Sequence, residues 1–235
     1  MSATIRIASR FNGPPQNGNG GYAAGLIAAT VGETVKVRLL QPLPLDRSLS
    51  ITAAARDRWR VHCGDELIAT ATRTDVLLEP PRPVPYVEAL GVSKHYVGFD
   101  KHLYSTCFVC GPERRPNDGL RIFPGTVPGI DIVAAPWLPE DSLDDGSGKV
   151  RPEFMWAALD CPGYWAFASL QPALLGELAV HIDRPVHIDE PCVVIGWRIS
   201  VDRRKHFVGT ALFDEDGERC ALGEATWIVL PKASM

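Results

Sequence analysis

The chain has 235 residues, of which 46% are hydrophobic and 22% charged, so disorder is excluded over most of its length. That length suits one large domain or two of roughly 100–120 residues each. The net charge of −4 comes from 24 basic and 28 acidic residues without a basic block, which argues against a nucleic-acid partner.

The apolar stretches of the chain are short. The longest, 23–30 and 221–230, contain glycine or a charged residue, and neither approaches the ~20 apolar residues of a membrane-spanning helix. The first residues, 1–7, lack the apolar segment of a secretory signal. Six cysteines in such a chain are expected to be reduced thiols. We therefore expect a cytoplasmic protein without a membrane partner.

In the first half, an extended piece precedes one helical segment and a run of strands. The helix is expected at 19–31, after a strand at 4–7. Alternating strand patterns then follow at 35–40, 49–61 and 67–78. The proline-rich stretch 80–85 ends this half as a stiff linker.

The second half repeats this order. An extended piece at 130–135 precedes a helix from Pro152 to about Leu170, with a break at 161–163 where Cys-Pro-Gly interrupts it. Strands are expected at 178–182, 192–201, 206–213 and 219–230, with a hairpin turn at 214–217. A helix followed by an antiparallel meander in each half predicts an α+β fold.

Three landmarks recur in the same order and indicate a duplication. Gly21-Tyr22 returns as Gly163-Tyr164, at an offset of 142 residues. The segment 35–46 returns as 178–189 at an offset of 143, with identical Val, Pro and Asp at matching positions. The turn glycine Gly64 returns as Gly217 at an offset of 153, in a longer hairpin. A period of this size is that of a domain, so the chain is expected to hold two copies of one fold.

Three motifs carry a resemblance to a known family. They are Phe11–Tyr22 with its Gly-Gly pair, Cys107-Phe-Val-Cys-Gly-Pro112 followed by 119–123, and Trp156-Ala-Ala-Leu-Asp160. Together they resemble segments of the tandem hotdog acyl-CoA thioesterases. The resemblance implies two tandem hotdog units, each a long helix wrapped by a curved antiparallel sheet. The units would span 1–85 and 116–235, joined by a linker at 86–115.

The segment Asn17-Gly-Asn-Gly-Gly21 places small and capping residues directly before the first helix. Unpaired backbone N–H groups at such a helix start can bind a developing oxyanion or a phosphate. The predicted substrate-binding residues here are Asn17, Asn19, Gly20 and Gly21. The alternative is a tight turn with an asparagine N-cap.

Asp160 is the predicted catalytic residue. It lies among apolar neighbours, where a carboxylate is costly unless it is bonded or has a chemical role. That role would be to activate water or to attack a thioester. The alternative is that Asp160 caps a helix segment that starts at Pro162.

Two other carboxylates, Glu153 and Glu224, are predicted partners of Asp160 because a close pair of acids suits acid–base chemistry. Single-domain relatives carry His-Gly-Gly beginning nine residues before the acid, whereas this chain has Arg151-Pro-Glu153. In the tandem relatives, a Thr and a Gln from the strands act as partners of the acid. This chain has no matching Thr, and Glu224 falls near the position where the Gln would be. With Gly21-Tyr22 as anchor, Gly18 stands opposite Asp160, so one site per chain is expected.

Cys107 and Cys110, with His95 and His102 upstream, do not form two close ligand pairs, and we predict no metal site. Arg203, Arg204 and Lys205 are predicted either as a solvated hairpin end or as contacts to the phosphates of coenzyme A.

The sequence therefore predicts a thioesterase that hydrolyses an acyl-CoA or a similar acyl thioester. It would need no cofactor, since coenzyme A is part of the substrate. The alternative is a non-catalytic binding module of the same fold, and an acyl-thioester dehydratase ranks last because no histidine stands in a helix-start motif. The sequence does not determine the oligomeric state, and a homo-oligomer is compatible with it.

Overall fold

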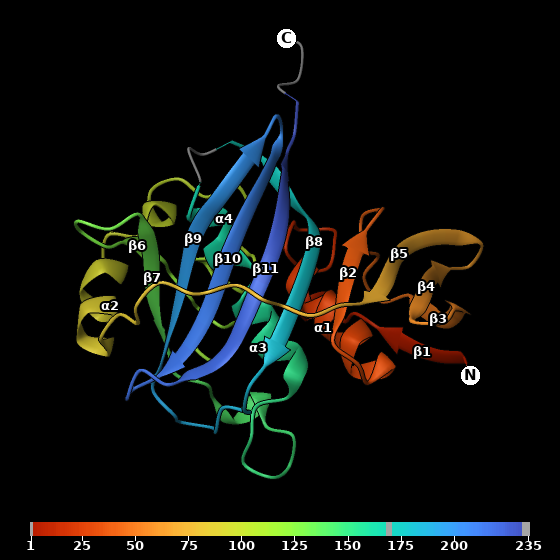
Figure 1. Cartoon of the computed structure of the whole chain (residues 1–235), viewed down its shortest axis with the longest axis horizontal. Coiled ribbons are helices and arrows are strands. Elements are labelled where there is room, and N and C mark those ends of the chain that lie inside the picture. Colours follow the sequence, from red (N-terminus) through yellow and green to blue (C-terminus); the bar gives the residue numbers. More distant parts are fainter. Residues whose placement is uncertain (1, 168–170, 232–235) are drawn as a thin grey trace.

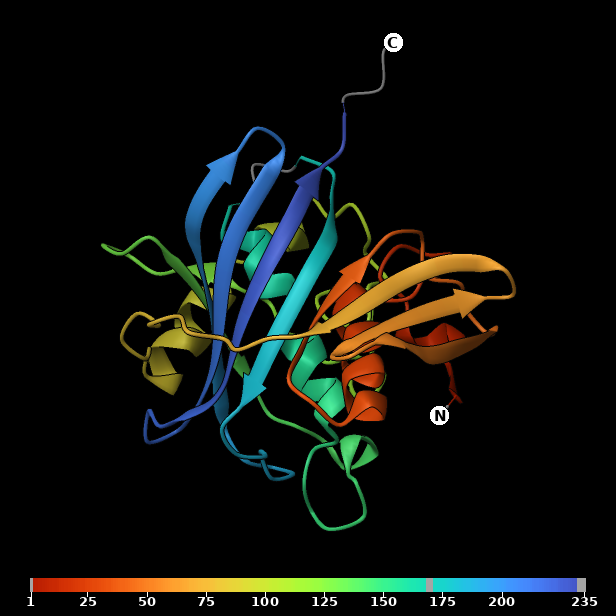
Figure 2. The ribbon, with the colours of Figure 1, turned by 45° about the vertical axis from the view of Figure 1, so that its right-hand side comes forward.

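The computed structural model describes residues 2–167 and 171–231. Its strands form one antiparallel sheet of eleven strands, in the order β1-β3-β4-β5-β2-β8-β11-β10-β9-β7-β6. The sheet curves around the helices, and α3 and α4 lie against the concave side of the long strands (Figures 1 and 2).

The elements follow the predicted alternation of one helical region and one meander in each half. The first half contains β1 (Ser2–Arg6), α1 (Gly20–Val31), β2 (Val35–Leu39), β3 (Ser48–Ala55), β4 (Arg58–Cys63) and β5 (Glu66–Arg73). The remainder contains α2 (Tyr86–Ser93), β6 (Gly125–Thr126), β7 (Ile132–Trp137), α3 (Pro152–Ala158), α4 (Cys161–Trp165), β8 (Ala173–Ile182), β9 (Cys192–Asp202), β10 (Lys205–Asp214) and β11 (Arg219–Val229). The α+β prediction is confirmed.

Two predicted elements differ from the structure. The single strand expected at 49–61 is a hairpin, because Asp57 adopts a left-handed backbone (φ 59°) that turns β3 into β4. The segment expected as a linker, 86–115, contains α2, whose Ala89 is buried in a cluster against the second-half sheet. The second-half helix is interrupted, but at Leu159–Asp160 and not at the predicted 161–163, which lies inside α4. The part expected at 168–170 lies outside the described residues.

The two halves join through the antiparallel pairing of β2 with β8. Lys36 stands opposite Ala179, and these residues are 143 positions apart, which is the offset of the strand repeat. The pairing is therefore symmetric about this point, as expected for two copies related by a two-fold rotation. The repeated aspartates Asp46 and Asp189 also share a left-handed backbone, with φ of 57° and 59°. The strand repeat is confirmed.

The Gly-Tyr landmark does not mark equivalent positions. Gly21 and Tyr22 open α1, whereas Gly163 and Tyr164 lie in α4, after α3 has already ended. The second helical region begins at Pro152 and is followed by a longer connection to β8. That part of the predicted register is wrong.

Helices α1 and α3 pack directly against each other across the join. A Cβ added at Gly25 would lie 2.6 Å from Cα of Glu153, and one added at Gly21 would lie 2.5 Å from Cβ of Asp160. Only glycine permits so close an approach of two helices. Packing thereby brings the start of α1 to the end of α3, where Asp160 lies.

Candidate active site

Asp160 occupies the break between α3 and α4 and is 2% exposed. Its Oδ2 accepts hydrogen bonds from the amide Nδ2 of Asn19 (2.8 Å) and the backbone N–H of Gly21 (3.0 Å). Although Asp160 is the N-cap residue of α4, its side chain makes no capping bond there. The carboxylate therefore bonds to the first half of the chain, and the capping interpretation is wrong.

A strand of the sheet stabilises the helix break at which Asp160 lies. Pro162 in the first turn of α4 has no N–H to continue the hydrogen bonds of α3. The carbonyl of Leu159 instead accepts a bond of 2.9 Å from the hydroxyl of Thr210, which is fully buried on β10. Sequence reasoning missed Thr210, since nothing in a strand pattern shows which residue faces the helix break.

The start of α1 leaves one backbone donor toward the site. Asn19 caps the helix by accepting the N–H of Tyr22 at Oδ1 (2.8 Å), and Gly21 donates to Asp160. Within the described part of the chain, the N–H of Gly20 has no acceptor. The asparagine N-cap is therefore confirmed, and the binding of an oxyanion or a phosphate by the remaining N–H stays a prediction.

A cavity of about 380 Å³ lies beside this arrangement, and its lining is mainly apolar. Asp160 contributes to the lining together with Asn17, Asn19 and Gly20. The apolar part comes from both halves and includes Leu39, Leu43, Tyr164, Trp165, Leu175 and Trp227. Oδ1 of Asp160 is buried and has no hydrogen-bond partner among the described residues.

Burial raises the pKa of Asp160 to about 7. The backbone N–H of Gly21 and the amide of Asn19 act in the opposite direction, because they stabilise the charged form. The cost of burying the carboxylate outweighs these two hydrogen bonds.

The structure does not bring Glu224 to Asp160. Gly223 faces the helices, since a Cβ there would lie 3.5 Å from Cβ of Leu159, and the next residue along a strand points to the opposite side of the sheet. Glu224 accordingly lies 4.0 Å from Nζ of Lys36 on that other side.

Glu153 is buried, but it lies about two helical turns before Asp160, which is roughly 10 Å along a helix axis. It is 3.6 Å from a guanidinium nitrogen of Arg151, and it is not among the residues that line the cavity. Among the predicted acids, Asp160 alone lies at the cavity.

The basic residues Arg203, Arg204 and Lys205 lie at the hairpin between β9 and β10 and are exposed. Lys205 pairs with Ile228 of β11, and Arg204 donates to the carbonyl of Val229 (3.3 Å). None of these three residues lines the cavity, although the strand partner of Lys205, Ile228, does.

Three buried cysteines lie at the inner side of the cavity. The Sγ atoms of Cys107 and Cys161 are 3.8 Å apart, and the ligand atoms of Cys107, Cys110 and Cys161 lie within 4.8 Å of one another. Hydrogen bonding from the other two thiols holds the pKa of the Cys107 thiol well below its usual value. Sequence reasoning identified the Cys107–Cys110 pair but gave no reason to add Cys161, 51 residues further on.

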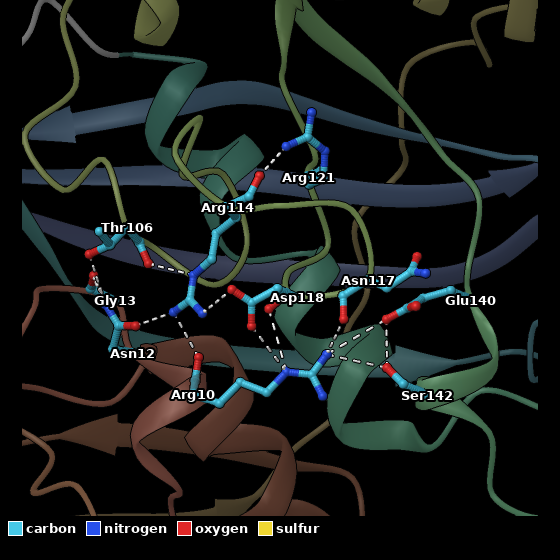
Figure 3. Close-up of polar contacts among 10 residues, drawn as sticks. All are labelled: Arg10, Asn12, Gly13, Thr106, Arg114, Asn117, Asp118, Arg121, Glu140 and Ser142. Atoms are coloured by element: carbon cyan, nitrogen blue, oxygen red, sulfur yellow. Dashed lines mark hydrogen bonds and ion pairs between the residues drawn. The ribbon is translucent and has the colours of Figure 1, made fainter.

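The segment with Cys107 is tied to the loop before α1 by one guanidinium group (Figure 3). Arg114 donates to the carbonyl of Thr106 (2.8 Å), the carbonyl of Arg10 (2.8 Å) and Oδ1 of Asn12. It also pairs with Asp118 at 3.1 Å. The connecting segment is thus part of the site's framework.

Comparisons with solved structures identify the fold. The chain is similar to the tesB protein of Mycobacterium avium subspecies paratuberculosis, with 11% identity, 98% of this chain and 93% of that chain covered, and a TM-score of 0.61. It is also similar to a candidate thioesterase II from Thermobifida fusca, with 14% identity, 98% and 94% covered, and a TM-score of 0.60. A third similar structure is a candidate thioesterase from Novosphingobium aromaticivorans, with 13% identity and a TM-score of 0.59; the match covers 98% of this chain and 96% of that chain.

These likenesses span nearly the whole chain, and the protein has the tandem hotdog fold that the sequence motifs predicted. No family model and no curated protein matches the sequence. In the described residues, no helix is long and apolar enough to cross a membrane.

Proposed function

We propose that the protein hydrolyses an acyl thioester in the cavity beside Asp160. The observation that carries this proposal is a buried carboxylate with one oxygen anchored by Asn19 and Gly21 and the other unpaired, in an otherwise apolar cavity. An unpaired buried oxygen costs stability, and such groups cluster at catalytic sites. The thioesterase names of two solved structures with this fold support the reaction class.

In the proposed reaction the carbonyl oxygen of the thioester accepts the N–H of Gly20, which stabilises the developing oxyanion. Oδ1 of Asp160 takes a proton from a water molecule as the water oxygen bonds to the carbonyl carbon. When the tetrahedral intermediate collapses, the carbon–sulfur bond breaks and Asp160 returns the proton to the leaving sulfur. The products are a carboxylic acid and a thiol.

Coenzyme A is the proposed thiol carrier. Its phosphates would meet Arg203, Arg204 and Lys205 at the hairpin between β9 and β10, while the acyl chain occupies the apolar cavity. Six free cysteines favour a reducing compartment, and the cytoplasm remains part of this proposal.

The substitution Asp160→Asn tests the proposal. The amide fits the same volume and can still accept from Gly21, but it cannot take a proton, so turnover should fall by ~10²–10⁴ with the fold retained. The measurement is thiol release from a panel of acyl-CoAs, with circular dichroism as the fold check. Glu224→Gln is the matched control and should keep wild-type turnover, because Glu224 lies on the opposite side of the sheet.

A folded Asp160→Asn protein with wild-type turnover would rule out Asp160 as the base. If the wild-type chain binds acyl-CoAs but releases no thiol from any of them, the binding-module alternative holds. Single turnover in H₂¹⁸O separates the two chemical routes. Direct attack by Asp160 forms a mixed anhydride, and addition of water to its aspartyl carbon would leave ¹⁸O in the Asp160 carboxylate. Activation of water leaves the protein unlabelled, so ¹⁸O in the protein identifies direct attack.

A further inference from the structure

Asp160 is followed directly by Cys161, which belongs to the buried group of three cysteines, Cys107, Cys110 and Cys161. We propose that these three cysteines bind one zinc ion. The proposal is opposite to the expectation from the sequence, which contained one close cysteine pair and no second pair. The fold supplies the missing ligand from the start of α4, a segment that no spacing rule connects to the pair.

The sulfur positions fit zinc. Tetrahedral coordination with bonds of about 2.3 Å places two thiolate sulfurs about 3.8 Å apart. The Sγ atoms of Cys107 and Cys161 are 3.8 Å apart, and Cys110 completes a triangle within 4.8 Å. All three side chains are at least 95% buried, so the sulfurs are held in place by packing.

Side-chain donors lie near the sulfurs. The amide Nδ2 of Asn19 lies 4.0 Å from the sulfur of Cys107. Trp165 lies beside Cys110, and its buried indole N–H has no acceptor in the part of the chain that the structure describes.

His102 adds a donor to Cys110 rather than a fourth ligand. Its Nδ1 accepts the backbone N–H of Tyr104 at 2.9 Å, so the neutral ring carries its proton on Nε2. That nitrogen is 3.4 Å from the sulfur of Cys110. The three cysteines and His102 face the cavity, so the fourth zinc position opens toward it.

As zinc ligands the three cysteines would be thiolates, and the ion would have to balance their charge. A second group of potential ligands, Glu190, Asp214 and Cys220, already surrounds the guanidinium of Arg184. By contrast, no lysine or arginine side chain is hydrogen-bonded to Cys107, Cys110 or Cys161 within residues 2–167 and 171–231. Soft thiolate ligands favour zinc over magnesium or calcium.

The ion would join two parts of the site. It would connect the turn at 107–110 to the residue after Asp160, and so would add a second constraint on the helix break beside the bond from Thr210. We therefore assign the zinc a positioning role for Asp160, independent of which acyl thioester enters the cavity.

The test uses the full chain, purified under reducing conditions without chelator from zinc-supplied medium. Elemental analysis should find about one zinc per chain, and exchange with Co²⁺ should give the near-ultraviolet band of sulfur-to-cobalt charge transfer. Cys161→Ser and Cys107→Ser should each lose most of the zinc and weaken that band. Cys63→Ser is the matched control, since Cys63 is a buried cysteine on β4 outside the cluster, and it should keep the full zinc content.

Several results would overturn the proposal. The first is a wild-type chain with free thiols that takes up neither zinc nor Co²⁺. The second is a folded Cys161→Ser variant with full zinc content, and the third is a disulfide within the cluster in the purified wild type. If the serine variants do not fold, the wild type is titrated with an organomercurial reagent and zinc release is measured. The proposal expects zinc to be released as these three thiols are modified. None of these measurements uses a substrate, so their outcome is separate from that of the hydrolysis proposal.

Discussion

The two halves of the molecule contribute different parts of one site. The first half provides donors at the start of α1, namely the amide of Asn19 and the N–H groups of Gly20 and Gly21. The second half provides the carboxylate of Asp160 at the end of α3. Neither half contains both, so the site exists only where the two helices meet.

The opposite end of the helix pair shows why a second, symmetric site is absent from the described residues. The helix there begins with Pro152, which has no N–H, and Arg151 at the N-cap makes no side-chain capping bond. The guanidinium of Arg151 instead lies 4.5 Å from the ring centroid of Phe154. The two copies of the fold therefore differ at their helix starts, and among the described residues it is the start of α1 that donates to a carboxylate of the other half.

Separating the two halves at the helix contact should have the largest effect. A Cβ at Gly25 would lie 2.6 Å from Cα of Glu153 and 2.8 Å from Cβ of Trp156, so Gly25→Ala must push the helices apart. We expect the free energy of unfolding to fall by about 1–3 kcal/mol, and activity to fall with it as Gly21 moves away from Asp160. Urea unfolding and thiol release measure the two effects.

Gly91→Ala is the control for helix propensity. Gly91 lies in α2 with nothing within 4 Å of an added Cβ, so alanine there should raise stability by up to ~1 kcal/mol. Equal effects of the two substitutions would show that the contact between α1 and α3 does not limit stability.

The asymmetry of the halves was only partly predictable from the sequence. The helix at 20–31 and the long strands follow from local patterns, since turn residues and alternation are local properties. Asp160 could be singled out because a polar group in an apolar run is visible in one segment, and Asn19 because a capping residue stands directly before a helix.

The partners of these residues could not be predicted, because they come from distant segments. Thr210 reaches the helix break from β10, and Cys161 reaches Cys107 across 54 residues. Glu224 is predicted in the site because it falls near the Gln of the tandem relatives, but such an alignment does not show on which face of the sheet a residue lies. A shift of one residue decides that face, which is why this prediction failed.

Disconnecting the first half from the connecting segment should lower stability by a similar amount, without separating α1 from α3. Arg114→Met keeps the apolar stem but removes the donors to the carbonyls of Arg10 and Thr106 (Figure 3). Losing hydrogen bonds from a charged donor should cost about 2–3 kcal/mol in urea unfolding. Arg198→Met is the control, since its pair with Asp131 is exposed and should contribute at most ~1 kcal/mol. Equal losses for the two variants would contradict a framework role for Arg114.

The smallest effect concerns acid stability, which should differ between the halves. Arg184 bonds Glu190 at 2.6 Å and also Asp214, whereas the repeat places Gln41 at the equivalent position of the first half. Burial alone would raise the pKa of Glu190 and of Asp214, but the hydrogen bonds from Arg184 outweigh it and hold both below their ordinary values of 4.5 and 3.8. A carboxylate with a lowered pKa adds stability above its unfolded pKa and loses it as the pH falls through the folded value.

Arg184→Gln copies the first-half residue and should therefore remove stability at neutral pH but not in strong acid. In urea unfolding, the difference between wild type and variant should be largest near pH 7 and should shrink as the pH falls below about 4. Arg6→Gln is the control, because the pair of Arg6 with Asp46 is exposed on the surface of the first half and contributes little at any pH. The hydrogen bonds from Arg184 weaken as the two carboxylates become protonated, whereas packing of its apolar stem does not depend on pH. If the difference in stability between wild type and Arg184→Gln stays constant across this range, Arg184 acts through packing.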